Sequence, residues 1–257
     1  MTNYFNIRYE FDRDEIHRAI ARRLAMPGAD YICVADGVIL NEVNRNKEYL
    51  GAVNGGMFSI CDSSYVPLYI KWIYGLKVGQ YCGSQIFKDI ICSRRYRMIF
   101  LGSSAEILNG LKENLTRLNP DVGQMQFVEL PYCEADEFDY HAIADIINRD
   151  GADIIWISLG APKQEWFMRN LKPYLNHGVM IAVGAAFKFL GSSEVKRAPE
   201  WMIRHHLEFI HRIFSEPGKQ IKRCLDILTS LPRLLYGEYR RKKANDTPPY
   251  TYTSENN

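Results

Sequence analysis

The stretch DIIWISL at residues 153–159 decides the fold class. Its unbroken run of apolar, mostly β-branched residues is typical of a strand that is buried on both faces of a sheet. The turn sequence GAPKQE follows at residues 160–165, and an amphipathic stretch comes after it. A buried strand, a turn and a helix in this order indicate a parallel sheet with crossover helices.

The same order recurs along the chain on both sides of this stretch. Together the repeats predict an α/β fold with a Rossmann-like, doubly wound, mainly parallel sheet. Strands are expected at residues 31–35, 57–61, 97–101, 124–130, 153–159 and 179–183, and helices up to residue 54 and at 66–74, 83–92, 105–118 and 140–149.

The composition is that of an ordinary globular protein. Of 257 residues, 47% are apolar and 24% are charged, and the net charge of +2 is too small to indicate a nucleic-acid-binding protein. The first thirteen residues contain no continuous apolar stretch, so no secretory signal is expected. No run reaches the roughly 18 apolar residues that a membrane span requires.

The character of the chain changes near residue 194. We expect a catalytic domain at residues 1–193, a basic helical appendage at 194–244 and a disordered tail at 245–257. Basic residues beside an apolar face fit an anionic membrane surface or a lipid diphosphate, although a helix that packs on the domain shows the same pattern. Beyond about residue 220 we expect this segment to reach the membrane and close over the lipid diphosphate rather than join the core.

Neither disulfides nor metals are expected. The six cysteines form no CxxC pair and several lie in apolar runs, so they are interpreted as buried thiols in a reducing cytoplasm. The only DxD sequence, at residues 12–14, precedes every strand predicted above, and the six histidines lack ligand spacing. We therefore expect no metal and no other cofactor.

Ligands of such sheets bind at the carboxyl ends of the strands, so the loops there should carry the site. Gly102, Ser103 and Ser104 join a strand to a helix and could bind a diphosphate with backbone N–H groups, although a simple helix cap uses the same residues. In the turn at residues 160–165, Gln164 adds a side-chain amide that a simple turn does not require, which favours a functional role for this loop over a structural one. Asp62 follows a strand and could act as a general base or as a helix cap.

Five sequences now occur in one order: GAPKQE at 160–165, GAAFKFLG at 184–191, RAPEW at 197–201, LEFIHR at 207–212 and EP at 216–217. As an ordered set they resemble the WecG/TagA/CpsF glycosyltransferases, over about residues 30–225. The resemblance implies inverting transfer, without an obligatory metal, from a UDP-sugar to an undecaprenyl-diphosphate-linked sugar in surface-polysaccharide synthesis. It also implies that Asp62 is the catalytic aspartate and that Gln164 lies beside the donor.

The chain departs from the family pattern at several positions. Asp36 stands where the family has asparagine, Ser63 follows Asp62 where the family has glycine, and Lys188 stands where the family commonly has aspartate. Residues 80–85 (QYCGSQ) replace the usual Arg-x-x-Gly-x-Asp. These changes bear on which donor is used, and they make Asp36 a second candidate base.

The residue assignments follow from these observations. Asp62 and Asp36 are the candidate catalytic residues, and the donor is assigned to Gly102, Ser103, Ser104, Gly160, Gln164 and Lys188. The acceptor diphosphate or the membrane is assigned to Arg197, Arg212, Lys222 and Arg223. We expect a peripheral protein at the cytoplasmic face of the membrane, possible self-association and no nucleic-acid partner. The alternatives are a nucleotide-sugar oxidoreductase or epimerase, and a non-catalytic assembly partner on the same scaffold.

Overall fold

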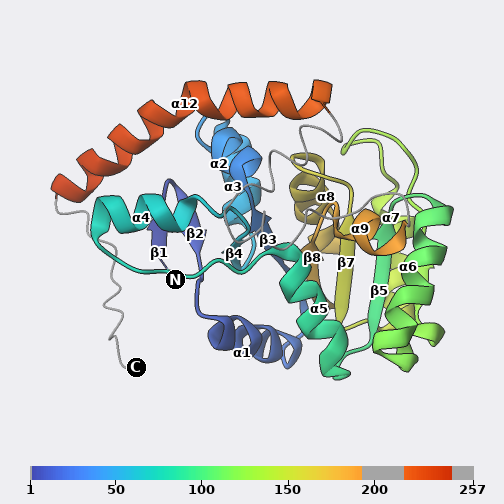
Figure 1. Ribbon diagram of the computed structural model, residues 1–257. Helices are drawn as coiled ribbons and strands as arrows, with labels where there is room; N and C mark the ends of the chain where they lie inside the picture. The colour runs from blue at the N-terminus through green and yellow to red at the C-terminus, as the bar shows by residue number, and fades with distance from the viewer. Residues whose placement is uncertain (1, 193–216, 245–257) are drawn as a thin grey trace.

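The computed structural model describes residues 2–192 and 217–244. Eight strands form one sheet in the order β1-β2-β4-β3-β8-β7-β5-β6 (Figure 1). Only β1 (Thr2–Tyr4) and β2 (Ile7–Tyr9) pair antiparallel, and all other neighbours pair parallel. The predicted α/β fold with a mainly parallel sheet is confirmed.

The six strands that the sequence predicts are all present. They are β3 (Gly28–Ala35), β4 (Phe58–Cys61), β5 (Met98–Gly102), β6 (Gln126–Val128), β7 (Ile154–Ser158) and β8 (His177–Ala182). Strands β1 and β2 were not predicted, because each has only three residues. Phe5 and Asn6 join them with φ angles of 54° and 66°, the left-handed backbone that a two-residue hairpin turn requires.

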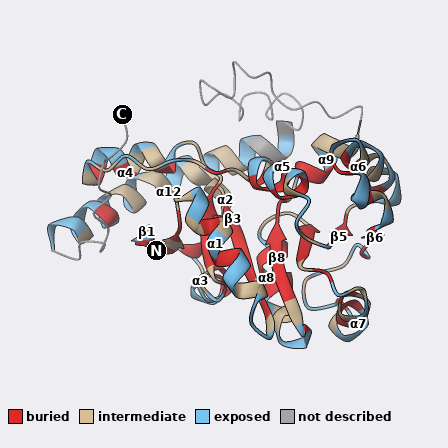
Figure 2. Ribbon diagram, turned by 90° about the horizontal axis from the view of Figure 1, so that it is seen from below, coloured by how far each residue is buried: buried red, intermediate tan, exposed pale blue. Residues whose placement is uncertain are grey.

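Helices cover both faces of the sheet, which explains why its strands are apolar throughout. One face packs against α2 (Gly37–Val43), α3 (Lys47–Asn54), α4 (Val66–Tyr74), α7 (Tyr140–Asp150) and α8 (Lys163–Leu171). The other packs against α1 (Arg13–Leu24), α5 (Gly83–Ser93), α6 (Ala105–Leu118) and α9 (Ala186–Gly191). Short 3-10 helices η1 (Pro120–Gln124) and η2 (Lys172–Tyr174) complete the order. Buried residues run along β3 and β8, while exposed residues lie on the outer sides of the helices (Figure 2).

The helix expected between β3 and β4 is divided into α2 and α3. Asn46 ends the continuity, because its side chain accepts hydrogen bonds from the N–H groups of Glu48 and Tyr49 and so caps a new helix. Asp12 of the DxD sequence likewise caps α1, and β1 and β2 precede it. The DxD sequence precedes all six predicted strands, as expected, but the two unpredicted strands come before it.

The basic segment forms α12 (Pro217–Lys243), a helix of 27 residues with Pro232 inside it. Its axis changes direction along its length (Figure 1), as expected for a helix that lacks one backbone donor. In the described part of the chain no helix is both long enough and apolar enough to cross a membrane.

The six cysteines are free thiols, but their burial differs from the prediction. Cys33 and Cys61 are buried, whereas Cys92 is exposed and the other three are half-buried. Cys92 lies near the end of α5 on its outer side, which an apolar run in the sequence does not reveal.

Candidate active site

Asp62 directly follows β4 at the carboxyl edge of the sheet. Its Oδ1 accepts a hydrogen bond from the backbone N–H of Gly83 at 2.8 Å, where α5 begins. Helix α4 starts only at Val66 and has Tyr65 in its N-cap position, so the interpretation of Asp62 as a helix cap is wrong. The carboxylate is half-buried between two loops that border the same edge.

Asp36 occupies the equivalent position on the neighbouring strand β3. The backbone N–H of Asp62 donates to the carbonyl of Ala35 at 3.0 Å. The two aspartates therefore follow the ends of neighbouring strands. Oδ1 of Asp36 accepts from the N–H groups of Val38 and Ile39 at 2.9 and 3.0 Å and so caps α2. Asp36 therefore already has a structural task that an asparagine could perform equally well.

The junction of β5 and α6 has the backbone of an anion-binding turn. Gly102 and Ser103 have φ angles of 97° and 68°, and a left-handed conformation is uncommon for serine. Ser104 is the N-cap of α6, but its side chain makes no capping hydrogen bond. The first turn of α6 thus keeps the N–H groups and positive dipole end that favour a diphosphate.

The turn after β7 is held by the side chain of Gln164. Its Oε1 accepts from the N–H of Gly160 at 3.1 Å, and its Nε2 donates to Glu165 Oε1 at 2.9 Å. Gln164 is only 4% exposed. Because both ends of the amide are used inside the protein, this geometry supports a role in shaping the turn.

The turn after β8 joins these two loops. Ser158 at the end of β7 donates its hydroxyl to the carbonyl of Gly184 at 2.8 Å, and a Cβ added to Gly184 would lie 3.6 Å from Gln164 Oε1. A Cβ added to Gly102 would lie 2.7 Å from the carbonyl oxygen of Ser158. Lys188 lies beyond this turn on α9 and is exposed.

Residues from five neighbouring strand ends thus form a row along one edge of the sheet, whereas Lys188, Lys222 and Arg223 lie on helices. Asp62 follows β4, Asp36 follows β3, Gly184 comes two residues after β8, the turn of Gly160 follows β7, and Gly102 is the last residue of β5. This arrangement places two carboxylates at one end of the edge and an anion-binding turn at the other. It can accommodate a proton acceptor and a diphosphate leaving group at once.

Helix α12 passes beside the two aspartates. A Cβ added to Gly37 would lie 2.9 Å from the Ile227 side chain, and the pKa of Tyr65 is raised by burial and by the nearby Cys224 thiol. Lys222 and Arg223 lie about one turn before Ile227 on the same helix. Arg197 and Arg212, assigned to the same role, lie outside the described residues.

Contrary to the expectation that this segment stays apart from the core, the second half of α12 packs into it. Leu234 and Leu235 contact the apolar cluster that α2 and α4 share. Glu238 is only 2% exposed, and it accepts hydrogen bonds from Tyr74 Oη and from Arg241, both at 2.9 Å. The sequence did not reveal this, because Glu238 lies in a predominantly basic stretch.

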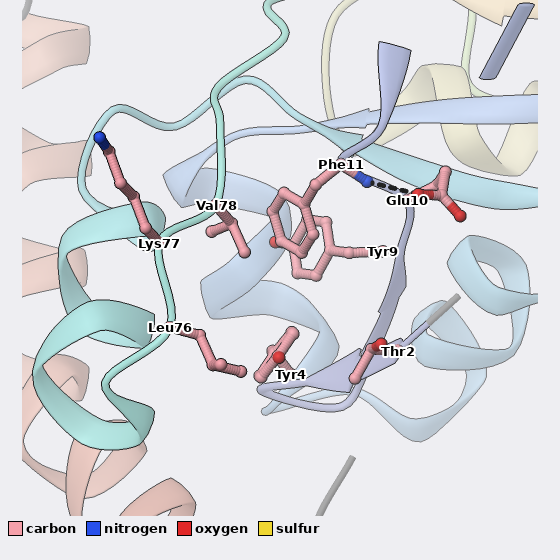
Figure 3. A pocket seen from close by; sticks show the side chains of 8 residues that line it. All are labelled: Thr2, Tyr4, Tyr9, Glu10, Phe11, Leu76, Lys77 and Val78. Carbon is pink, nitrogen blue, oxygen red and sulfur yellow. Dashed lines mark hydrogen bonds between the residues drawn. The ribbon is translucent and has the colours of Figure 1, made fainter. Parts of the chain in front are cut away.

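A small pocket at the β1–β2 edge is lined by none of the residues in this row (Figure 3). Its only carboxylate, Glu10, accepts hydrogen bonds from the N–H groups of Phe11 and Asp12 and so has a local structural task. The pocket is lined by Thr2, Tyr4, Tyr9, Glu10, Phe11, Leu76, Lys77 and Val78.

Across residues 2–192 and 217–244, no cluster of three or more His, Cys, Asp or Glu side chains could hold a metal ion.

Glu165 is a component of the site that the sequence interpretation did not single out. It is fully buried, and Tyr49 Oη donates to its Oε2 at 2.9 Å. Burial raises the pKa of Glu165 to about 8, with a further rise from the charge of Asp36, while hydrogen bonds from Gln164 and Tyr49 oppose the shift. In the sequence Glu165 stands only as the last residue of the GAPKQE motif, and nothing there indicates that its side chain is buried.

We expect Gln164→Ala to weaken use of the donor and to destabilise the protein. The substitution leaves the Gly160 N–H and one oxygen of Glu165 without their partner, and a loss of this kind costs about 1–3 kcal/mol. Denaturant unfolding and the KM for the donor measure the two effects. Unchanged stability together with a raised KM would instead indicate that the Gln164 amide contacts the donor and does not hold the turn.

Comparison with known proteins adds independent information. The sequence model described as "Glycosyl transferase WecG/TagA/CpsF family" matches residues 2–245. An N-acetylglucosaminyldiphosphoundecaprenol N-acetyl-beta-D-mannosaminyltransferase of Bacillus spizizenii is 24% identical over 224 residues, 86% of this chain and 83% of the relative. The protein of the same name from Bacillus subtilis is 25% identical over 236 residues, 88% of this chain and 90% of the relative.

Proposed function

The chain belongs to the WecG/TagA/CpsF family of glycosyltransferases, and from this premise we propose that it transfers a sugar from a nucleotide diphosphate donor to a polyprenyl-diphosphate-linked sugar. The observation that carries the proposal is the row of strand ends, with Asp62 near one end and the anion-binding turn at Gly102 near the other. Both similar Bacillus proteins are named for an undecaprenyl-diphosphate-linked acceptor. Their named acceptor is therefore the first one to test.

In the proposed reaction, the carboxylate of Asp62 accepts the proton of the acceptor hydroxyl. That oxygen attacks the anomeric carbon, the bond to the diphosphate breaks, and the nucleoside diphosphate leaves with the bonding electrons. A single displacement inverts the anomeric configuration. Backbone N–H groups around Ser103 and Ser104 stabilise the charge that develops on the leaving group.

The helix α12 supports the proposed assignment of the acceptor. Ile227 packs on Gly37, directly beside Asp36, so Lys222 and Arg223 lie near the end of the edge where the acceptor hydroxyl must meet Asp62. Two cations at this place can bind the diphosphate of a lipid-linked acceptor. The residues of α12 thus extend the site beyond the sheet.

A nucleotide-sugar oxidoreductase or epimerase is the alternative enzyme class. It requires a glycine-rich turn such as GxGxxG to bring a dinucleotide against a helix, whereas the turn after β5 reads Gly102-Ser103-Ser104. Thermal-shift measurements with UDP, GDP, CMP and NAD separate the alternatives. We expect UDP to raise the melting temperature and NAD to leave it unchanged, and the opposite pattern would favour the oxidoreductase.

Turnover then separates an enzyme from a non-catalytic assembly partner. A panel of UDP-sugars with the polyprenyl-diphosphate-linked acceptor should yield one elongated lipid product. We propose that no metal takes part, so the rate should survive EDTA. Nucleotide binding without turnover on any sugar of the panel would support the assembly role.

We also propose that the protein works while peripherally bound to the cytoplasmic face of an anionic membrane. Apolar side chains are exposed on two neighbouring helices: Leu68 and Trp72 on α4, and Ile221, Leu225, Leu228, Tyr236 and Tyr239 on α12. Trp72 has 73% of its surface exposed. Exposed basic residues of α12, including Lys222, Arg233 and Arg240, accompany them, and each can add about 1 kcal/mol near anionic lipid.

We expect Trp72→Ala to weaken binding to anionic liposomes by about tenfold, because burying a side chain of this size contributes at least about 1.5 kcal/mol. Cosedimentation measures the change, and binding should also weaken as salt rises. Met26→Ala is the control. Met26 is 56% exposed, but it lies just before the amino end of β3, at the edge of the sheet opposite to the carboxyl edge that carries Asp62. Equal, salt-insensitive binding by both variants and the unaltered protein would contradict the proposal.

A further inference from the structure

Glu165 is the one fully buried acid beneath the described strand-end loops, and the proposed reaction does not use it. It is the third residue of α8, and its side chain extends to α3 on the same face of the sheet. Its relative exposure is 0%. A carboxyl group in such a place is costly unless other groups bond to it, so its partners indicate what it does.

The partners of Glu165 form a chain that ends at the donor side of the site. Tyr49 Oη donates to Oε2 at 2.9 Å, and Gln164 Nε2 donates to Oε1 at 2.9 Å. The other end of that amide, Gln164 Oε1, accepts from the N–H of Gly160 at 3.1 Å. A buried side chain on α3 is thereby connected to the turn that ends β7.

The direction of the Gln164 amide depends on Glu165. The Gly160 N–H can only donate, so it requires the amide oxygen, and Glu165 Oε1 accepts from the amide nitrogen at the other side. Without Glu165 the nitrogen of a nearly buried amide would lose its acceptor. The amide could then turn over and leave the Gly160 N–H unpaired.

We propose that Glu165 is a positioning residue for the donor: by accepting from Gln164 it fixes the direction of that amide and holds the Gly160 turn in the shape that binds the sugar nucleotide. The inference rests on the proposed function, because it assigns the donor to this turn. Gly184, which lies against Gln164, belongs to the same positioned surface. Glu165 itself does not contact the donor.

The surroundings of Glu165 make this arrangement sensitive to pH. The titratable groups that interact with it across the packed elements are Asp36 at the N-cap of α2, Tyr49 on α3 and Cys33 on β3, and Gln164 is its partner on α8. Burial raises the pKa of Tyr49 and that of Cys33 well above their ordinary values, so neither ionises below pH 9. The pKa of Glu165, raised to about 8 chiefly by burial, places its own ionisation within that range.

The sign of the effect on the donor follows from charge. Below about pH 8 Glu165 is neutral and its carbonyl oxygen still accepts from Gln164. Above that pH a negative charge forms in a low-dielectric interior near the place of an anionic diphosphate, so the donor should bind more weakly. The KM for the donor should rise as pH increases through 8, with a smaller change in kcat.

Steady-state transfer kinetics from pH 6.5 to 9.5 test the proposal with Glu165→Gln, Glu165→Ala and the surface control Glu48→Ala on α3. We expect Glu165→Ala to raise the KM for the donor about tenfold, because the loss of one hydrogen bond costs about 1.4 kcal/mol. Glu165→Gln keeps an acceptor for Gln164, so its KM should stay within about threefold at pH 7 and lose its rise above pH 8. Glu48→Ala should match the unaltered protein.

Hydrogen exchange of the peptide at residues 158–164 provides a second readout that needs no substrate. It should accelerate in Glu165→Ala and not in Glu165→Gln. If the unaltered protein transfers no sugar, the proposed function fails while this measurement still tests the positioning role. Folded Glu165→Ala with unchanged exchange and unchanged donor KM, or Glu165→Gln that keeps the rise above pH 8, would overturn the inference.

Discussion

Asp62→Asn should lower kcat for sugar transfer by about 10²–10⁴-fold while leaving the fold and the affinity for UDP nearly unchanged. The amide has the shape of the carboxylate and its oxygen can still accept from the Gly83 N–H, but it cannot take the proton of the acceptor hydroxyl. Initial rates at saturating donor and acceptor measure the loss. Isothermal titration with UDP measures the retained affinity.

Asp36→Asn is the matched control, because it makes the same chemical change on the neighbouring strand. The oxygen of the new side-chain amide would keep the cap on α2, and asparagine is the residue type that the family resemblance gives at this position. We expect transfer within about threefold of the unaltered protein. If Asp36→Asn abolished transfer and Asp62→Asn did not, the base would be Asp36.

Gly102→Ala should lower the free energy of unfolding by about 2–4 kcal/mol and weaken the binding of UDP. The φ angle of 97° strains any residue with a side chain, and the new Cβ would meet the carbonyl oxygen of Ser158 at 2.7 Å. Because that oxygen belongs to the backbone of the next strand, it cannot turn aside. The strand ends β5 and β7 must therefore separate, which disturbs the turn assigned to the diphosphate.

Gly160→Ala separates strain from crowding. Gly160 also has a positive φ, 79°, but a Cβ there would have no heavy atom within 4 Å. We expect a loss of about 1–2 kcal/mol, from the backbone alone. Urea unfolding of both variants measures the difference, and equal losses would show that the contact with Ser158 has no energetic effect.

The sequence predicts the central strands and the position of the site because both depend on local patterns. Continuous apolar runs identify β3, β5, β7 and β8, and parallel pairing brings the residues that follow these runs to one edge. Apolar runs thus placed Asp62 and Gly102 at this edge, whereas the choice of Asp62 as the base came from the family resemblance. The hairpin of β1 and β2 was missed, because strands of three residues carry too little pattern.

The sequence could not show the roles of side chains whose hydrogen-bond partners are distant along the chain. Asp62 precedes two serines and resembles a helix cap, yet its oxygen bonds to Gly83, and the capping aspartate is Asp36. Glu165 meets Tyr49 across 116 residues. Glu238 is buried against Tyr74 although its immediate neighbours in sequence, Gly237 and Tyr239, are exposed.

The stereochemistry of a single transfer tests whether the protein is an inverting glycosyltransferase that elongates a lipid-linked sugar. The unaltered protein is incubated with a ¹³C-labelled UDP-sugar that supports turnover and with the polyprenyl-diphosphate-linked acceptor, and the new linkage is examined by mass spectrometry and by NMR of its anomeric centre. We expect one lipid product that is heavier by one sugar, one UDP released for each linkage formed, and an anomeric configuration opposite to that of the donor. Retained configuration, or consumption of the donor with no elongated lipid, would contradict this expectation.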